Sequence, residues 1–351
     1  MRGDDTGMGD TVSAQMRAAV VYECGEPPRP GTVARPEPGP GTAVVAVRAA
    51  PITPLDVLCA TGTSYFGRPA VPYVPGVSGV GVVEAAAAAD PKPPQVAAGT
   101  RVWFPTTAGM RPGNGSMARL CAVPEADLIP IPDGVADDQA AALGLSAVAA
   151  WMALTWRAGL RDGERVLVLG AGGVVGQVAV QAARLLGASR VVAACRSPQA
   201  QEAARTAGAD EVVELSSAEG PDRLAERLAR ACGGTVDVVI DPLCGVPATA
   251  AARVLGHRGR LVNLGGSAGP EAVFDSAILR SRSAALLGYT NNDITPQQRR
   301  DALTAVLDHA AAGRLGVLFD TVDLDDVAAA WAAQANGAAH RRIVVRIPGG
   351  P

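Results

Sequence analysis

The sequence is poor in residues on which several classes of protein depend. Its 351 residues include six cysteines and three histidines, and aromatic residues make up only 3%. Lysine occurs once, at Lys92, and the 31 basic residues, nearly all scattered arginines, are offset by 34 acidic ones. The sequence therefore does not indicate a concentrated positive field, and we do not expect a nucleic-acid binder.

The few cysteines are spaced too widely for a disulfide scaffold, and no two have the Cys-x-x-Cys spacing of a zinc knuckle. The longest apolar runs are interrupted before they reach the roughly 18 residues of a membrane span. Residues 1–15 lack the basic-then-apolar order of a secretion signal and are expected to form a flexible extension. Together these features predict a cytoplasmic protein without membrane association.

Hydrophobic residues, in contrast, make up 48% of the chain, enough to fill the cores of about two domains. Short β-branched runs ended by Gly or Pro recur between residues 16 and 123, which predicts a barrel-like β domain, with a loop over the proline-rich residues 27–40. Residues 137–156 have helical apolar spacing, and Asp133 and Asp137 are placed to cap that helix. Strands and helices then alternate, which predicts a doubly wound parallel sheet.

The strongest motif is a glycine loop from Gly170 to Gly176, which joins an expected strand, 165–169, to an expected helix, 175–186. The unpaired N–H groups and the positive dipole end of such a helix point at whatever lies over the turn, and glycines let a diphosphate approach the backbone. Val175 occupies the place of the third glycine of GxGxxG. The alternative is that the glycines form only a tight turn between strand and helix and bind no ligand. The loop opens a β-α-β unit, however, and this context favours dinucleotide binding.

The end of the next expected strand favours NADPH over NADH. The segment Ala194-Cys195-Arg196-Ser197 contains no acid for the ribose 2′-hydroxyl of NAD, and it offers a guanidinium and a hydroxyl to a 2′-phosphate. Arginine suits phosphate because its planar fork makes paired, charged hydrogen bonds. The alternative is an arginine solvated at the end of a strand.

In their order along the chain, these and further motifs resemble the medium-chain dehydrogenase/reductase superfamily, specifically its zinc-independent quinone oxidoreductase branch, the zeta-crystallin-like proteins. The resemblance covers nearly everything from Met16 to Pro348. Besides the glycine loop, it rests on Met16-Arg-Ala-Ala-Val-Val, Thr53-Pro-Leu-Asp56, Pro72-Tyr-Val-Pro-Gly76, Gly79-Val-Gly-Val-Val-Glu84, Gly99-Thr-Arg-Val-Trp103, Val238-Val-Ile-Asp241, Gly259-Arg-Leu-Val262 and Arg342-Ile-Val-Val345.

The resemblance implies a GroES-like β-barrel catalytic domain formed by residues 16–141 and 291–351, an NADPH-binding Rossmann domain at 142–290, and a homodimer. The positions that match the family's cofactor-contacting segments are Ser146, Gly170, Gly172, Gly173, Val174, Val175, Gly176, Arg196, Ser197, Asn263, Leu264, Gly265 and Arg342.

Three positions depart from the family pattern. Val174 stands where many members have glycine, Thr53 replaces an asparagine, and Ala200 replaces a lysine that helps to bind the 2′-phosphate in some relatives. Arg196 is the residue expected to compensate for the missing lysine.

A metal site is not expected. A catalytic zinc needs thiolate, imidazole or carboxylate ligands, and two positions that hold them in zinc-dependent relatives are occupied here by Thr53 and Val77. The three histidines, His257, His309 and His340, come late in the chain and are interpreted as surface or packing residues. Without a Lewis acid, oxidation of simple alcohols is not expected.

The resemblance therefore implies hydride delivery to an electron-poor carbon of a quinone or enone. By family position and the scarcity of aromatic residues, we interpret Tyr65 and Thr53 as catalytic candidates, with Tyr65 as a hydrogen-bond or proton donor, and Phe66 and Tyr289 as substrate contacts. Apolar packing within a loop explains Tyr65 and Phe66 equally well. Asp56 is interpreted as a capping or turn residue.

Three other functions are open. A dedicated enoyl reductase acting on a polyketide-type intermediate and a non-catalytic NADPH-binding protein would both keep the glycine loop. The segment Gly265-Gly-Ser267-Ala-Gly269 also matches the GxSxG of hydrolases. It falls late among the alternating elements, Pro270 follows directly, and a suitable order of Asp and His is missing, which argues against a hydrolase.

Overall fold

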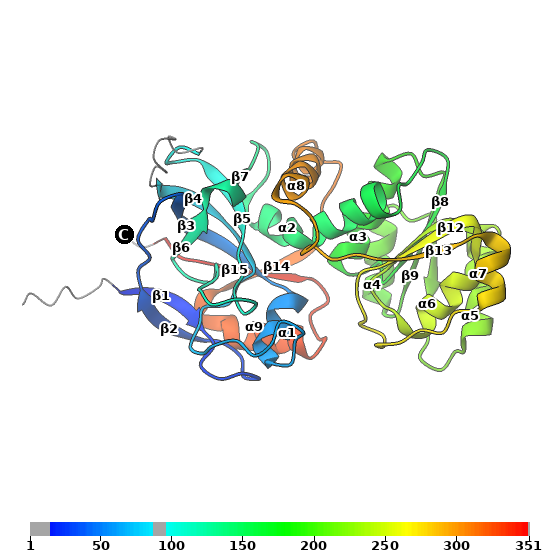
Figure 1. The fold of residues 1–351 in the computed structure, drawn as a ribbon, viewed down its shortest axis with the longest axis horizontal. Coiled ribbons are helices and arrows are strands. Elements are labelled where there is room, and N and C mark those ends of the chain that lie inside the picture. Colours follow the sequence, from blue (N-terminus) through cyan, green and yellow to red (C-terminus); the bar gives the residue numbers. More distant parts are fainter. Residues whose placement is uncertain (1–14, 87–95, 350–351) are drawn as a thin grey trace, which may run out of the picture.

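The computed structural model describes residues 15–86 and 96–349. The expected flexible extension therefore lies outside the described residues, apart from Gln15, where the first strand begins. The described chain forms a β-rich half and a parallel sheet covered by helices, with a group of helices between them (Figure 1). This confirms the predicted fold class, a doubly wound Rossmann sheet beside a GroES-like β domain.

Segments from both ends of the sequence build the large sheet of the β-rich half. Its strand order is β14-β15-β3-β4-β5-β7, and β6 also pairs with β3. The long β3 pairs antiparallel with β4, β6 and β15. The strands are β3 (Thr42–Ile52), β4 (Ser78–Ala86), β5 (Arg101–Pro105), β6 (Leu120–Pro124), β7 (Ile129–Pro130), β14 (Phe319–Asp323) and β15 (Arg342–Arg346).

A separate antiparallel pair, β1 (Gln15–Val20) and β2 (Arg29–Ala34), corrects the prediction of a continuous loop over residues 27–40. Pro30 has no N–H to donate, but β2 belongs to a two-stranded sheet and is an edge strand, where proline is tolerated. The remaining elements of this half are the helices α1 (Pro54–Thr61) and α9 (Val327–Ala335) and the 3₁₀ turns η1 (Glu125–Asp127) and η3 (Leu324–Asp326).

The other half is a parallel sheet with the strand order β10-β9-β8-β11-β12-β13. The order reverses between β8 and β11, and doubly wound sheets bind ligands at the carboxyl ends of the strands beside such a reversal. The strands are β8 (Arg165–Leu169), β9 (Arg190–Cys195), β10 (Glu211–Glu214), β11 (Val236–Asp241), β12 (Leu255–Asn263) and β13 (Ala285–Gly288). The helices are α3 (Val174–Leu185), α4 (Pro198–Thr206), α5 (Pro221–Cys232), α6 (Gly245–Arg253) and α7 (Ser276–Arg282).

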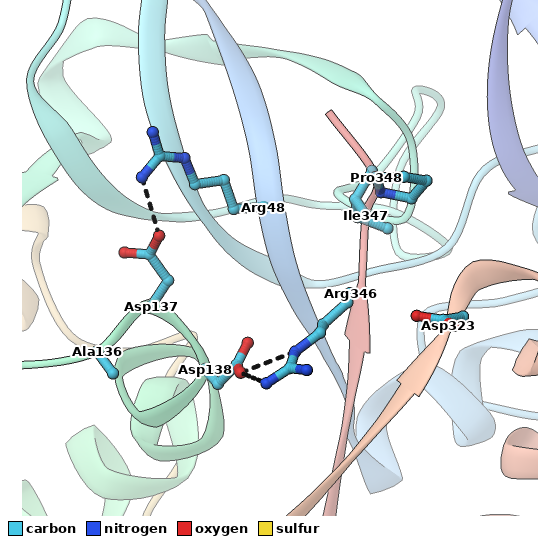
Figure 2. A pocket seen from close by; sticks show the side chains of 8 residues that line it. All are labelled: Arg48, Ala136, Asp137, Asp138, Asp323, Arg346, Ile347 and Pro348. Atoms are coloured by element: carbon cyan, nitrogen blue, oxygen red, sulfur yellow. Dashed lines mark hydrogen bonds and ion pairs between the residues drawn. The ribbon is translucent and has the colours of Figure 1, made fainter. Parts of the chain in front are cut away.

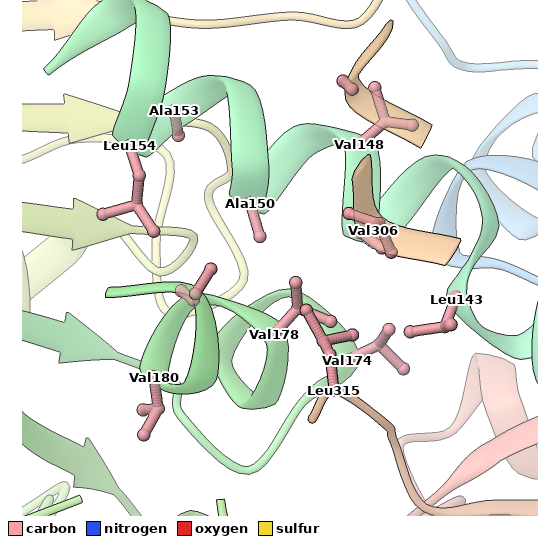
Figure 3. Close-up of a cluster of buried hydrophobic side chains, with 14 of the residues drawn as sticks. Leu143, Val148, Ala150, Ala153, Leu154, Val174, Val178, Val180, Val306 and Leu315 are labelled. Carbon is pink, nitrogen blue, oxygen red and sulfur yellow. The ribbon is translucent and has the colours of Figure 1, made fainter. Parts of the chain in front are cut away.

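Helices join the two halves. α2 (Asp137–Met152) continues as a π-helical turn, η2 (Ala153–Arg157), and packs against α3 and α8 (Pro296–Ala311). Figure 3 shows the buried side chains that meet there, among them Leu143 of α2, Val178 of α3 and Val306 of α8. α2 is broken at Gly144, whose φ of 38° and ψ of -140° are not helical and suit glycine. The break follows closely on the predicted domain boundary at 141/142.

The start of α2 is not capped as expected, because within the described part of the chain its N-terminus has no side-chain capping hydrogen bond. Asp137 instead accepts from Nε and Nη2 of Arg101 at 3.0 and 2.7 Å and from Arg48 at 3.2 Å. Asp138 accepts from Arg346 at 2.6 Å (Figure 2). Long-range ion pairs to the β-rich half have therefore replaced the local cap.

One expectation about apolar runs was wrong. By length and composition alone, Asp137–Arg157 is long and apolar enough to cross a membrane. However, 67% of its apolar window is buried inside the protein, where it packs in the cluster between α2, α3 and α8. We therefore assign this helix to the core.

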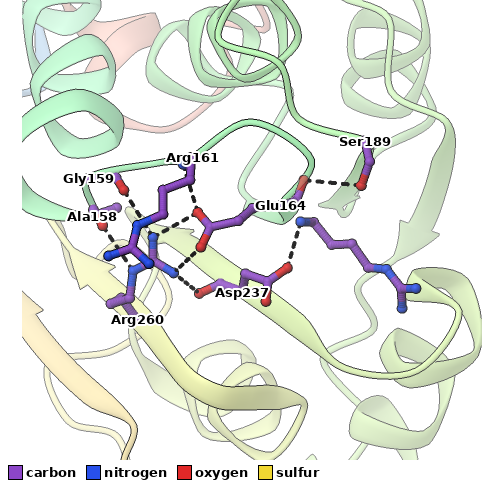
Figure 4. A network of polar contacts seen from close by, with 8 residues as sticks. Ala158, Gly159, Arg161, Glu164, Ser189, Asp237 and Arg260 are labelled. Carbon is purple, nitrogen blue, oxygen red and sulfur yellow. Dashed lines mark hydrogen bonds and ion pairs between the residues drawn. The ribbon is translucent and has the colours of Figure 1, made fainter.

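A network of hydrogen bonds and ion pairs connects the end of η2 with the parallel sheet (Figure 4). The Nη1 and Nη2 atoms of Arg260 donate to the two carboxylate oxygens of Glu164, both at 2.8 Å, and its Nε donates to the carbonyl oxygen of Ala158 at 2.9 Å. Burial alone would raise the pKa of Glu164, but the hydrogen bonds from Arg260 and from the Arg161 amide outweigh it and lower that pKa. Arg260 pairs with Val238 at the start of β11, so the network is remote from the carboxyl ends of the strands.

Candidate functional site

The predicted glycine loop turns directly from β8 into α3. Gly170 has a positive φ of 62°, and its amide donates to the carbonyl oxygen of Ala194 at 2.8 Å. α3 begins after Gly173, and no side chain of the described residues caps its first turn. Free N–H groups and the positive dipole end of a helix therefore face the end of β8, which is the arrangement that binds an anion.

Two glycines of the loop are required by close packing. A Cβ on Gly172 would lie 2.3 Å from the Cβ of Ala200 in α4, and one on Gly176 would lie 2.4 Å from the Cα of Ala171. Val174, between them, is buried in the cluster against α2 and α8 (Figure 3). The side chain of Val174 therefore belongs to the core, and only its backbone is available to contact a ligand.

A cavity of about 800 Å³ opens at this turn. Its lining brings together five of the predicted cofactor residues, Gly170, Gly172, Gly173, Arg196 and Ser197. The other eight, which are Ser146, Val174, Val175, Gly176, Asn263, Leu264, Gly265 and Arg342, do not line it. The volume lies in the usual range for small-molecule sites, and the glycine floor is open to a flat or extended ligand.

The wall beside β9 carries positive charge. Ser197 accepts from the amide of Ala200 at 3.1 Å and so caps α4, while the Arg196 side chain is exposed and has no ion-pair partner in the described parts of the chain. One carboxylate lines the cavity, that of Glu219, and Arg227 and Arg223 bind it at 2.6 and 3.6 Å. The cavity wall therefore favours an anionic ligand.

A second cation is buried where the two halves meet. Arg342 donates to the carbonyl oxygen of Ile52 at 2.8 Å and to Oγ of Ser146 at 2.9 Å, but its buried Nε has no hydrogen-bond partner in the described structure. Burial lowers the pKa of Arg342 to about 10, an effect that nearby Asp56 partly opposes. Burying a guanidinium without a bound carboxylate costs free energy of folding. An anion such as a diphosphate would offset this cost by pairing with the positive charge.

The predicted segment from Asn263 to Gly265 stabilises the neighbouring turn. Asn263 donates to the Asp241 carboxylate at 2.8 Å and to the carbonyl oxygen of Gly265 at 2.9 Å. Asp241 also accepts from the amides of Leu243 and Cys244 at 2.9 and 2.8 Å, and burial raises its pKa despite these bonds. These contacts tie together the carboxyl ends of β11 and β12.

Thr53, a predicted catalytic residue, is buried and occupied by structural bonds. Its hydroxyl donates to Oδ2 of Asp56 at 2.6 Å and accepts from the Asp56 amide at 3.2 Å. The Thr53 amide donates to the same Oδ2 at 2.9 Å and completes a capping box at α1. Asp56 also accepts from the amides of Gly76 and Val77 at 3.0 and 2.8 Å. The interpretation of Asp56 as a capping residue is confirmed, and the structure gives the Thr53 hydroxyl the same structural role.

A second cavity, of about 750 Å³, lies on the β-rich side and also reaches α2, the loop after β13 and the start of α8. Phe66, predicted as a substrate contact, lines it together with Leu55, Leu145, Met110 and Asn291. Tyr65 does not line it and is 76% exposed, with its ring centroid 4.1 Å from that of Phe66. The structure therefore brings one of the two loop aromatics to this cavity.

Tyr289, predicted as a substrate contact, is connected to this cavity through another residue. Its hydroxyl donates to Oδ1 of Asn291 at 2.7 Å, and Asn291 donates to the carbonyl oxygen of Leu145 at 3.0 Å. Tyr289 does not line the cavity, its ring meets Trp156 edge-on, and burial raises its pKa. Sequence reasoning missed Asn291, although its place just beyond the carboxyl end of β13 was an available signal.

The two residues expected at the zinc-ligand positions, Thr53 and Val77, are poorly suited to bind a metal ion in this structure. The Val77 side chain is fully buried and apolar, and the Thr53 hydroxyl is bonded to Asp56. Within residues 15–86 and 96–349, no group of three or more His, Cys, Asp or Glu side chains lies close enough to hold a metal ion. The six cysteines are free thiols.

Known proteins resemble both halves of the chain. Residues 39–133 match the alcohol dehydrogenase GroES-like domain, and residues 174–309 match the zinc-binding dehydrogenase family. Mouse quinone oxidoreductase is 30% identical over 253 residues, which are 71% of this chain and 73% of that relative. A phenolphthiocerol/phthiocerol polyketide synthase of Mycobacterium tuberculosis is 33% identical over 228 residues, or 64% of this chain, but this chain spans only 10% of that synthase polypeptide.

Solved structures share the fold. A mycobacterial quinone oxidoreductase superposes with a TM-score of 0.83 at 24% identity, covering 95% of this chain and 100% of the other. A mycobacterial structure complexed with NADPH gives 0.82 at the same identity and coverage. At this level of identity the likeness concerns the fold alone.

Proposed function

Because this chain belongs to the medium-chain dehydrogenase/reductase superfamily, in its quinone oxidoreductase branch, we propose that it reduces quinones or enones with NADPH and without zinc. The observation that carries this proposal is the cavity of about 800 Å³ in which the Gly170–Gly173 turn meets Arg196 and Ser197. A dinucleotide needs such a glycine floor, and the absence of an acid at the end of β9 favours the phosphorylated ribose.

The residues present fit a reduced nicotinamide nucleotide. The uncapped start of α3 offers backbone N–H groups to a diphosphate, and the unpartnered Nε of Arg342 offers a buried positive charge. Such a cofactor supplies hydride when it is bound. The role of this chain is then to orient the two reactants, exclude water and stabilise the negative charge that develops on the substrate oxygen.

The cavity of about 750 Å³ is our candidate substrate site. Leu55, Phe66 and Leu145 give it apolar walls, and Asn291 adds an amide held between Tyr289 and the Leu145 carbonyl. The lining is mixed, because Arg111, Asp127 and Arg299 also belong to it. Its apolar walls suit a flat quinone or enone, and its polar groups can orient the substrate. We keep Tyr65 as the proposed proton donor, because a loop residue at the mouth of a site can close over substrate.

The proposed independence from zinc is supported by the chemistry of the residues. Threonine and valine at the two ligand positions offer no thiolate, imidazole or carboxylate to the metal. Quinones and enones are already electron-poor at the carbon that accepts hydride, so no Lewis acid is required. The proposed hydride transfer therefore requires no metal ion.

The direct test is an NADPH oxidation screen with purified protein against quinones, enones and enoyl thioesters, with and without a chelator. We expect turnover of at least one class and no loss of activity with chelator. Binding of NADPH without turnover of any class would favour the non-catalytic alternative. Loss of all activity after removal of zinc would refute the proposal.

A second candidate is an enoyl reductase acting on a polyketide-type intermediate. It is supported by the 33% identity to part of a polyketide synthase. The chemistry is the same, hydride addition to a conjugated C=C bond, but the acceptor is a thioester. Faster reduction of enoyl thioesters than of quinones in the same screen would favour it.

We also propose a cytoplasmic homodimer formed through the edge of the parallel sheet. Among the residues that the structure describes, β13 pairs only with β12 and the preceding helix α7 has no buried residue, and Leu286 in β13 is 37% exposed. An uncovered edge strand with exposed apolar residues is a natural place for a second copy. Light scattering should give a dimer for wild type and for Leu58→Lys, a similarly exposed leucine in the other half, and a monomer for Leu286→Lys. A dimeric Leu286→Lys variant would contradict this interface.

A further inference from the structure

The cavity at the glycine turn has walls from both halves of the molecule. Most of its lining comes from the parallel sheet, but Gly337, Ala339 and His340 also line it. These residues belong to the loop between α9 and β15, and β15 is part of the sheet of the β-rich half. A ligand in this cavity is therefore within reach of the β-rich half as well as of the Rossmann half.

His340 and Arg196 are the two lining residues able to add positive charge. Within the described residues, neither side chain has an ion pair or a side-chain hydrogen bond, and both are exposed. The carboxylate in the lining, Glu219, is neutralised by Arg223 and Arg227. A histidine and an arginine that share one cavity without a competing carboxylate fit a phosphate group.

Their positions favour the 2′-phosphate over the diphosphate. The diphosphate belongs over the uncapped start of α3, and the 2′-phosphate beyond the end of β9, where Arg196 and Ser197 lie. Ala200 presents only a methyl group there, packed against Gly172. His340 reaches the same cavity from the loop before β15, two residues ahead of Arg342, which donates to Ser146 at the junction.

We propose that His340 is a second ligand of the 2′-phosphate of NADPH, contributed by the β-rich half opposite Arg196. This inference rests on the proposed function, because it assumes that NADPH occupies the cavity. The phosphate is then held between two segments that are far apart in the sequence, and binding of NADPH draws the two halves together. His340 is a specificity-determining residue in this arrangement, without a part in the chemistry.

The test measures dissociation constants by calorimetry for NADPH, NADH, 2′,5′-ADP and 5′-ADP. For His340→Ala we expect about a 10- to 100-fold rise in Kd for NADPH and 2′,5′-ADP, the size of one charged hydrogen bond, and less than about a twofold change for NADH and 5′-ADP. His340→Lys should retain NADPH binding. The matched control His257→Ala removes an exposed histidine that does not line the cavity and should leave every Kd unchanged.

A double-mutant cycle strengthens the test. If His340 and Arg196 bind the same phosphate, their separate losses in NADPH affinity should not add in the double alanine variant. Equal losses for NADPH and NADH, or no loss for either, would overturn the assignment of His340. If wild type binds neither nucleotide, the proposed function itself fails, which is a distinguishable outcome.

Discussion

Replacing two neighbouring glycines with alanine should separate the packing of the turn from its contact with the cofactor. At Gly172 a Cβ would lie 2.3 Å from the Cβ of Ala200 and 2.6 Å from its Cα. Carbon atoms pack best at about 3.5–4.0 Å, so α4 must move by about 1 Å or more. Such overpacking costs about 1–3 kcal/mol, and each kcal/mol lowers the Tm of a domain of this size by about 2–4 °C.

Gly173 is the matched control, because a Cβ there would have its nearest neighbour, the Gly170 carbonyl oxygen, at 3.6 Å. Gly173→Ala should therefore melt at the wild-type temperature without nucleotide. It should nevertheless lose NADPH affinity, because Gly173 lines the cavity at the start of α3 and a Cβ would stand in the path of the diphosphate. Thermal unfolding and NADPH titration of both variants measure these effects. An unchanged Tm for Gly172→Ala would refute the packing argument, and wild-type affinity in Gly173→Ala would refute the placement of the diphosphate.

Three further predictions concern single side chains. Arg196→Ala should raise the KM for NADPH about tenfold and leave that for NADH nearly unchanged, and equal changes would remove Arg196 from the 2′-phosphate site. Cys244 has φ 56° and ψ -154°, a region essentially reserved for glycine, so Cys244→Gly should stabilise the protein by about 1–3 kcal/mol in denaturant unfolding while Cys244→Ala should not. The pKa of Glu164 lies below its ordinary value of 4.5 in the folded protein, so its pair with Arg260 stabilises the fold above that pH and loses its contribution as the pH falls through the lowered pKa. Glu164→Gln should therefore cost about 1–3 kcal/mol at pH 7 and progressively less below about pH 4, and a cost independent of pH would exclude this explanation.

Local patterns predicted the elements that carry the glycine turn. The apolar strand before Gly170 and the helix after Gly173 are set by residues adjacent in sequence, and so is the capping role of Asp56 beside Thr53. Such features depend on spacings of a few residues, which the sequence displays directly.

Features that depend on distant residues were missed. Asp137 was expected to cap α2 because it stands at the start of the helical pattern of apolar residues. Instead its carboxylate binds Arg101 and Arg48, which lie far earlier in the chain. His340 is exposed, as interpreted, but nothing in its own neighbourhood indicates that it shares a cavity with Arg196. Long-range contacts of this kind are decided by tertiary packing, which a single sequence does not display.

The place of β15 has a consequence for the order in which the protein assembles during synthesis. The strands of the parallel sheet all lie within residues 165–288, so this sheet can form while the later residues are still being translated. The large sheet of the β-rich half must wait for Arg342–Arg346, because that strand covers the Ala49–Ile52 edge of β3. Until then this edge has unpaired backbone groups, so a nascent chain that stalls before Arg342 is the species most exposed to aggregation and to capture by chaperones.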